Sequence, residues 1–234
     1  MMKVANWLLA LLLFVAGGAS AALADEGVSV GGVSAVLIKP ARPRASIILL
    51  AGGSGQLGIT SAGVITQLTG NQLVRTREAY AARGLAVLLP DAGVDLAQAI
   101  AFMAAIKRPV TLAGTSRGTQ RAAQGLASGA RPDKLVLTSG FLSDQSGDSD
   151  NVENILGSPA NLPPTLVVEH RHDDCPKTLP AGVDPFVAWA HGRAHAVWLD
   201  GGISEGDPCE AMAHHGFNGI DGKVVSVVAG FAGR

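Results

Sequence analysis

The sequence predicts an α/β fold in which helices cover both faces of a mostly parallel sheet. Short runs of Val, Ile and Leu alternate with longer segments of helical periodicity, which is the pattern of α/β proteins. Several of these runs are apolar at every position, as is typical of strands that are covered on both sides. Residues capable of chemistry follow the ends of three of the runs.

The elements can be placed in chain order from these patterns. The expected strands span residues 34–38, 46–50, 86–89, 110–113, 134–138, 165–169 and 194–199. The expected helices span residues 71–83, 95–107, 117–128, a short stretch near 185–191, and 221–233. Residues 143–164 are polar and contain Gly and Pro, with too few hydrophobic residues for a separate cap domain. We therefore expect a single domain with an open active centre.

The N-terminus has the pattern of a secretory signal peptide. Lys3 precedes an apolar stretch from Trp7 to Ala16, and Ala22-Leu23-Ala24 provides the small residues of a cleavage site. The apolar stretch is shorter than the roughly 20 residues that a spanning helix needs, which disfavours a membrane anchor. We expect residues 1–24 to be removed and residues 25–234 to be exported to the periplasm or secreted.

Charge and cysteine content restrict the partners and the compartment. The chain has 18 Lys and Arg against 19 Asp and Glu, a balance that gives no support to a nucleic-acid partner. Cys175 and Cys209 are the only cysteines, and an isolated pair in an oxidising compartment favours a disulfide over two free thiols. Such a bridge would contribute roughly 3–4 kcal/mol by loop closure.

The segment Gly114-Thr115-Ser116-Arg117-Gly118 separates an expected strand from an expected helix. A serine in such a turn adopts a strained conformation with its hydroxyl exposed, and small neighbours avoid collision with the crossing backbone. The same five-residue pattern recurs around Ser29 and Ser204. Ser29 lacks a buried strand before it and a helix after it, and Pro208 interrupts the segment after Ser204. Ser116 is therefore the candidate nucleophile.

A serine nucleophile needs a histidine to take its proton and a carboxylate to orient that histidine. Candidate acids are Asp173 and its neighbour Asp174 after the strand 165–169, with Asp144 after the preceding strand as a more distant choice. A turn-capping role is the structural alternative for the two adjacent aspartates. His214 and His215 lie in the last loop and are the candidate bases.

From about Ser46 to the C-terminus, the chain resembles small α/β-hydrolases of the serine esterase or dienelactone-hydrolase-like kind, in an exported form without a lid. The resemblance rests on Leu49-Leu50-Ala51-Gly52-Gly53, which is similar to the family's His-Gly-Gly oxyanion loop, on the Ser116 elbow, on His172-Asp173-Asp174-Cys175, and on His215-Gly216-Phe217. Ala51 stands where many members carry histidine, a departure that affects the local hydrogen bonding of that loop rather than its backbone donors.

The resemblance implies a role for each candidate. Ser116 would be the nucleophile, Asp173 the acid and His215 the base, in the family's chain order of Ser, Asp, His. The backbone amides of Gly53 and Arg117 would form the oxyanion hole. A Cys175–Cys209 disulfide would then tie the acid loop to the base loop, because its cysteines lie close to the acid and the base in the chain.

The other chemistry considered is disfavoured. His170, His172, Asp173 and His215 could supply zinc ligands, but the sequence has no helical His-x-x-x-His pair and no Cys/His cluster. The glycines at 52, 53 and 55 are not followed by the Gly-Lys-Ser/Thr of a phosphate loop. We expect no metal and no cofactor, and hydrolysis of a small-molecule ester through an acyl-enzyme. A binding protein without catalysis, or an acyl or peptidyl transferase with the same triad, remains the alternative.

Overall fold

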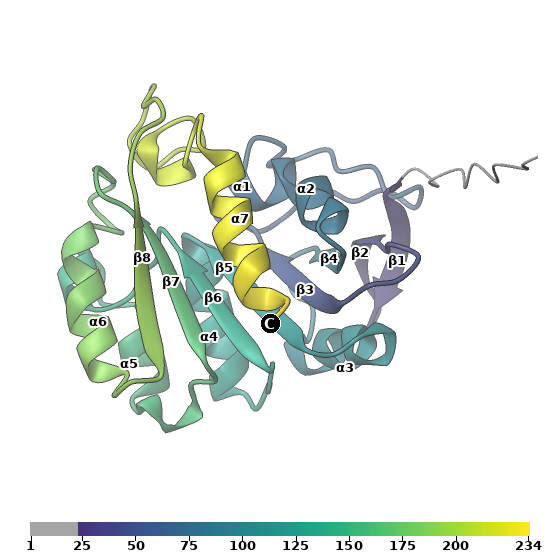
Figure 1. Cartoon of the computed structure of the whole chain (residues 1–234), viewed down its shortest axis with the longest axis horizontal. Coiled ribbons are helices and arrows are strands. Elements are labelled where there is room, and N and C mark those ends of the chain that lie inside the picture. The colour runs from purple at the N-terminus through teal and green to yellow at the C-terminus, as the bar shows by residue number, and fades with distance from the viewer. Residues whose placement is uncertain (1–22) are drawn as a thin grey trace, which may run out of the picture.

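The computed structural model describes residues 23–234 and contains one eight-stranded sheet in the order β1-β2-β4-β3-β5-β6-β7-β8 (Figure 1). The strands are β1 (Glu26–Val30), β2 (Val33–Ile38), β3 (Ala45–Leu50), β4 (Leu85–Pro90), β5 (Val110–Thr115), β6 (Lys134–Thr138), β7 (Thr165–His170) and β8 (Ala194–Leu199). Apart from Leu23 and Ala24, the expected signal peptide at residues 1–24 lies outside the described residues.

The sheet is mostly parallel, as predicted. Neighbouring strands from β4 through β3, β5, β6 and β7 to β8 run parallel, whereas β2 pairs antiparallel with both β1 and β4. Strand β1 is not among the strands expected from the sequence. It forms the outer edge of the sheet with Ser29 exposed, and its small residues give a weak strand signal.

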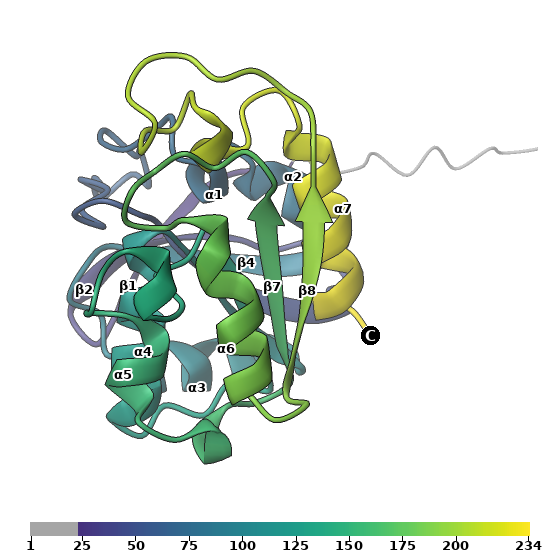
Figure 2. The same ribbon diagram turned by 90° about the vertical axis from the view of Figure 1, so that its left-hand side faces the viewer.

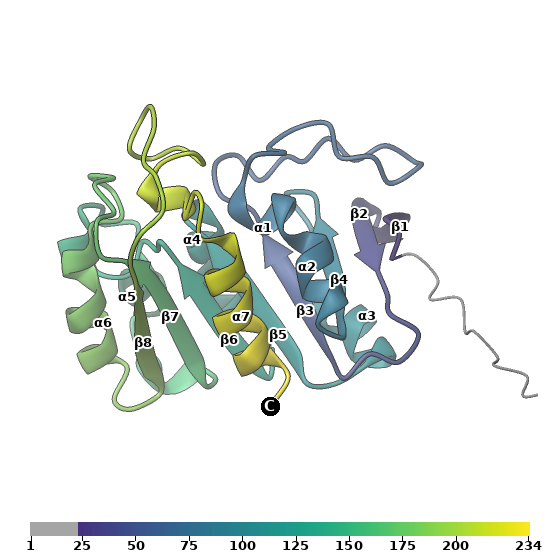
Figure 3. The same ribbon diagram turned by 45° about the horizontal axis from the view of Figure 1, so that its top comes forward.

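Helices cover both faces of the sheet, which confirms the predicted architecture. The helices are α1 (Gln72–Arg75), α2 (Arg77–Ala82), α3 (Leu96–Ile106), α4 (Arg117–Ala127), α5 (Val152–Leu156), α6 (Val183–Trp189) and α7 (Asp221–Ala232). Figure 2 shows the sheet edge-on between α6 and α7, and Figure 3 shows α1, α2 and α7 on the same face. Alternate residues of β3 supply the two hydrophobic cores: Ile48 and Leu50 join the core under α3 and α4, and Ile47 and Leu49 join the core under α7.

Two stretches differ from the predicted elements. The expected helix over residues 71–83 is divided between α1 and α2 at Thr76, where the backbone (φ −101°, ψ 4°) departs from helical values and the hydroxyl donates a 2.6 Å hydrogen bond to the carbonyl oxygen of Gln72. Within residues 143–164, the short helix α5 places the buried side chain of Val152 in the core beside α4. This segment therefore packs onto the domain and does not form a separate cap.

The parallel strands bring the candidate functional loops to one edge of the sheet. The carboxyl ends of β5, β7 and β8 point the same way, and the loops that follow them gather near the loop after β3 (Figures 1 and 3). In open α/β sheets, ligands bind at this carboxyl edge. The sheet topology thus assembles a site from segments that are far apart in the sequence.

Candidate active site

Ser116 lies in a strained turn between β5 and α4. Its backbone has φ 53° and ψ −126°, a conformation that side-chain-bearing residues rarely adopt. A Cβ on Gly114 would lie 2.4 Å from the carbonyl oxygen of Gly118, and a Cβ on Gly118 would lie 2.2 Å from that of Leu50. Both positions therefore require glycine, and the pattern that flanks Ser116 has a direct steric cause.

The other two serines in the same pattern lie in different settings. Ser29 is an exposed residue within the edge strand β1. Ser204 is exposed in the long loop after β8, where its Oγ accepts a 3.4 Å hydrogen bond from the amide of His214. Neither serine stands at a strand-to-helix turn, so only Ser116 has the geometry of a nucleophile elbow among the three.

Asp173 and His215 form a buried hydrogen-bonded pair. Asp173 Oδ2 lies 2.9 Å from His215 Nδ1, and the two side chains are 0% and 5% exposed. Asp173 Oδ1 accepts a 2.9 Å hydrogen bond from the amide of Cys175, and the Thr178 hydroxyl lies 3.2 Å from Oδ2 and 3.0 Å from Nδ1. A carboxylate hydrogen-bonded to Nδ1 favours the tautomer that carries its proton there, and in that tautomer Nε2 is the proton acceptor.

The loop that carries His215 is fixed by its backbone. The Ser139 hydroxyl, just beyond β6, donates a 2.7 Å hydrogen bond to the carbonyl oxygen of His215. A Cβ on Gly216 would lie 2.0 Å from the carbonyl oxygen of Ala211, and buried Phe217 has a φ of 55°. Glycine at 216 is thus a packing requirement, and the His-Gly-Phe segment holds the imidazole in one place.

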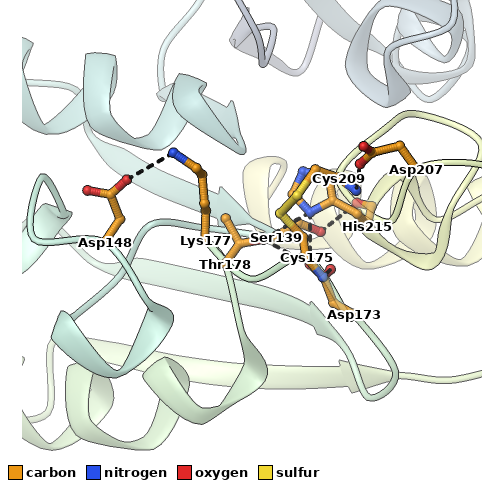
Figure 4. The surroundings of a disulfide bond; sticks show 9 residues. All are labelled: Ser139, Asp148, Asp173, Cys175, Lys177, Thr178, Asp207, Cys209 and His215. Carbon is orange, nitrogen blue, oxygen red and sulfur yellow. Dashed lines mark hydrogen bonds and ion pairs between the residues drawn. A yellow bond between two sulfur atoms is a disulfide. The ribbon is translucent and has the colours of Figure 1, made fainter.

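The predicted disulfide between Cys175 and Cys209 is present, with a Cα–Cα distance of 4.6 Å. Figure 4 shows it beside the Asp173–His215 pair, joining the loop after β7 to the loop after β8. The covalent link therefore limits how far the carboxylate and the imidazole can separate.

The alternative acids and base considered from the sequence do not take part in the Asp173–His215 pair. Asp174 is exposed, and Asp144 Oδ1 accepts hydrogen bonds from two asparagine side chains at 2.6 and 2.9 Å. The His214 ring stacks on that of His170 at 4.4 Å between centroids, and its Nδ1 lies 3.1 Å from the main-chain oxygen of His172. None of these contacts resembles the carboxylate–imidazole pair of a triad.

Ser116 and His215 line one cavity of about 360 Å³ at the carboxyl edge of the sheet. Within the described residues, no hydrogen bond joins the Ser116 hydroxyl to the His215 imidazole. Such catalytic contacts are often long in enzymes without substrate, and they shorten when the substrate binds. The cavity is also lined by charged side chains, by apolar side chains and by the disulfide: Arg117, Lys177, Glu210, Leu68, Phe141, Ala211, Cys175 and Cys209.

The two predicted oxyanion donors line the same cavity. Gly53 has a φ of 56°, and Arg117 is the first residue of α4. In residues 23–234, neither backbone amide donates a hydrogen bond to another protein group. A Cβ on Gly52 would lie 3.0 Å from the Ser116 Cβ, so glycine there lets the loop approach the serine closely. Two free amides beside a serine hydroxyl can bind a negatively charged oxygen.

Glu169, at the end of β7, is buried beside the pair and was not singled out from the sequence. Burial, together with the neighbouring charge of Asp173, raises its pKa well above the ordinary value of 4.5. Its Oε1 accepts a 3.0 Å hydrogen bond from the amide of His170, while its Oε2 has no partner among the described residues. Burial therefore favours the neutral form of the Glu169 carboxyl over its charged form.

Thr178 and Ser139 were also missed. Ser139 directly follows β6, and this position at a strand end was the available signal for it; Thr178 lies five residues after Asp173, away from any strand end. The backbone conformation of Ser139, with a φ of 43°, has no sequence signature.

The described residues offer neither a metal-binding cluster nor a membrane-spanning helix. Across residues 23–234, no three His, Cys, Asp or Glu side chains are grouped so that they could hold a metal ion. None of the helices in that range has the length and apolar character needed to cross a bilayer.

Comparison with known proteins gives structural matches only. No protein-family model matches the chain, and no curated protein matches its sequence. The esterase domain of a Rhodothermus marinus protein superposes with a TM-score of 0.62 at 14% identity, over 91% of this chain and 98% of that one. A Pyrococcus furiosus esterase also gives 0.62 at 14% identity, over 90% and 89%. An esterase/lipase from an uncultured bacterium gives 0.57 at 17% identity, over 93% and 86%.

The strand order, the parallel pairing and these superpositions establish that the chain has the α/β-hydrolase fold. The fold expected from the sequence is therefore confirmed. Because one fold supports many activities, the function has to be argued from the site.

Proposed function

We propose that this protein is a serine hydrolase that cleaves small-molecule esters through a Ser116–His215–Asp173 triad. The observation that carries the proposal is the buried Asp173–His215 hydrogen bond, whose imidazole lines the same cavity as the strained Ser116. The structural neighbours that are described as esterases support the reaction class.

Each residue of the site has a step in the proposed reaction. Ser116 Oγ attacks the ester carbonyl carbon while His215 Nε2 takes the hydroxyl proton, and the negative charge moves onto the carbonyl oxygen. The amides of Gly53 and Arg117 stabilise that oxyanion, and Asp173 stabilises the imidazolium. Collapse breaks the bond to the alcohol oxygen, which leaves with the proton from Nε2.

Water completes the cycle. His215 Nε2 takes a proton from a water molecule, whose oxygen attacks the acyl carbon of the Ser116 ester. When the second tetrahedral intermediate collapses, the proton returns to Ser116 Oγ and the carboxylic acid leaves. No redox partner or co-reactant other than water is needed for this sequence.

We also propose that the protein acts outside the cytoplasm as one hydrolase domain of residues 25–234. The signal-like pattern of residues 1–24 supports export, and so does the disulfide, because such bonds persist in oxidising compartments.

The test compares p-nitrophenyl acetate and butyrate hydrolysis by the wild type, Ser116→Ala and Ser204→Ala. Ser204 is a matched control because it lies in the same five-residue pattern on an exposed loop. Ser116→Ala is expected to lose about 10⁴-fold or more in kcat, as removal of a triad nucleophile does, while Ser204→Ala keeps the wild-type rate.

Three outcomes contradict the proposal. Full activity in Ser116→Ala would assign the chemistry to another residue. A wild type that hydrolyses neither ester would favour a binding protein. New ester products in the presence of an added alcohol, formed faster than the free acid, would assign acyl transfer.

A further inference from the structure

The side chain of Arg121, on the second turn of α4, lies against the loop that follows β3. Its guanidinium donates to the carbonyl oxygens of Ala51 and Gly53, the latter at 3.2 Å, and lies 3.5 Å from that of Gly52. Glycine at 55 makes room for it, since a Cβ there would lie 2.7 Å from the Arg121 Cζ. One side chain therefore contacts three consecutive carbonyl groups.

The direction of the Gly53 amide follows from that of the Gly52 carbonyl, because the two groups share one peptide unit. In a trans peptide, the carbonyl of one residue and the amide of the next point in opposite directions. The Gly52 carbonyl points toward Arg121 and also accepts a 3.1 Å hydrogen bond from the amide of Gly55. The Gly53 amide in the same peptide unit is therefore directed away from Arg121, and it has no hydrogen-bond partner in the described part of the chain.

The two sides of this loop line different cavities. Gly52 and Gly53 line the cavity that contains Ser116, whereas Arg121 lines a second cavity of about 380 Å³ behind the loop. Arg121 binds carbonyl groups of the loop on the side of the second cavity, and the Gly53 amide stays available on the side of the Ser116 cavity. This is the arrangement that an oxyanion hole requires.

Arg121 also supplies hydrogen bonding that Ala51 lacks. The sequence places alanine where related oxyanion loops carry histidine, so residue 51 has no side-chain donor. In residues 23–234, Arg121 forms no ion pair with a carboxylate. Burial, with the nearby charge of Arg117, lowers the pKa of the Arg121 guanidinium from its ordinary range. Its main partners are thus the backbone carbonyls of the loop.

We propose that Arg121 is a positioning residue that holds the 51–53 loop so that the Gly53 amide faces the oxygen of the bound ester. This inference rests on the proposed esterase function. It adds that the oxyanion hole depends on a side chain that does not touch the substrate. Removing the guanidinium should therefore weaken binding of the transition state more than binding of the substrate.

The test uses Arg121→Met, which keeps the length of the side chain and removes its donors. Arg131→Met is the matched control, because Arg131 likewise donates to two carbonyl oxygens, those of Leu126 and Ala130, at 2.9 and 2.8 Å. For p-nitrophenyl butyrate, kcat of Arg121→Met is expected to fall about 10- to 100-fold, with KM changed by less than about twofold. Arg131→Met should keep both constants.

Two further readouts separate positioning from general loss of structure. The inhibition constant of a trifluoromethyl ketone, which forms an oxyanion in the site, should rise in Arg121→Met by the same factor as kcat/KM falls. In Arg121→Ala, millimolar guanidinium chloride should restore part of kcat through the cavity behind the loop, and equal sodium chloride should not. Arg121→Lys, a variant that retains the charge, should lose less kcat than Arg121→Met.

The results distinguish this inference from the proposed function. If the wild type is active and Ser116→Ala is not, wild-type kcat in Arg121→Met overturns only the role of Arg121. The same holds if kcat is lost without weaker ketone binding and without guanidinium rescue. If the wild type is inactive, or Ser116→Ala is as active as the wild type, the esterase function and this inference both fail.

Discussion

Replacing Cys175 and Cys209 together by alanine removes the covalent link between the acid loop and the base loop. The cysteines are 34 residues apart, and the loop-entropy relation for a loop of that size gives about 4 kcal/mol of lost unfolding free energy. For a chain of this length, such a loss lowers Tm by about 8–15 °C. Thermal unfolding followed by circular dichroism measures it directly.

The same variant tests whether the bridge supports the site as well as the fold. We expect kcat to fall about tenfold at a temperature where the variant is still folded, because small displacements of catalytic groups lower rates strongly. Reductant should lower the Tm of the wild type by a similar amount and leave the alanine variant unchanged. A Tm within about 2 °C of the wild type, with unchanged kcat, would refute the reasoning.

Three further predictions concern single residues. Thr178→Val removes a hydroxyl that contacts both members of the acid–base pair, and kcat should fall by up to about tenfold while Thr178→Ser keeps it. Gly118→Ala should lower the unfolding free energy in urea by about 2 kcal/mol or more, because its Cβ meets a β3 carbonyl, whereas Gly222→Ala, in open space on α7, should not destabilise the protein. Because its pKa is raised, Glu169 keeps its proton to higher pH in the folded protein than in the unfolded chain, so the unfolding free energy falls as pH rises from 4.5 toward that raised pKa. Glu169→Gln should abolish this part of the pH dependence. Equal slopes of unfolding free energy against pH in the wild type and the variant would contradict the prediction.

Features with a regular pattern could be predicted from the sequence. Continuous apolar runs located seven of the strands, and the strand and helix that flank Ser116 selected it from three similar segments. The placement of Asp173 and His215 followed from the ends of β7 and β8, because parallel strands carry their following loops to one edge. The apolar runs and the positions of Ser116, Asp173 and His215 after them can be read directly from the spacing of residues in the sequence.

Features that depend on a single contact could not be predicted. Thr178, Ser139 and Arg121 act through one or a few hydrogen bonds each, and a lone polar residue has no periodicity that reveals its partner. The break at Thr76 is a backbone departure at one residue inside an otherwise helical pattern. The raised pKa of Glu169 arises from burial, which depends on the assembled sheet.

The central claim is that Ser116 is the activated nucleophile, and covalent labelling tests it most directly. The wild type, treated with a fluorophosphonate and digested, should give one modified peptide with the adduct on Ser116. Asp173→Asn should label much more slowly, because the imidazole is no longer held in the required tautomer. An unlabelled wild type, or an adduct on another residue such as Ser204, would contradict the proposed site.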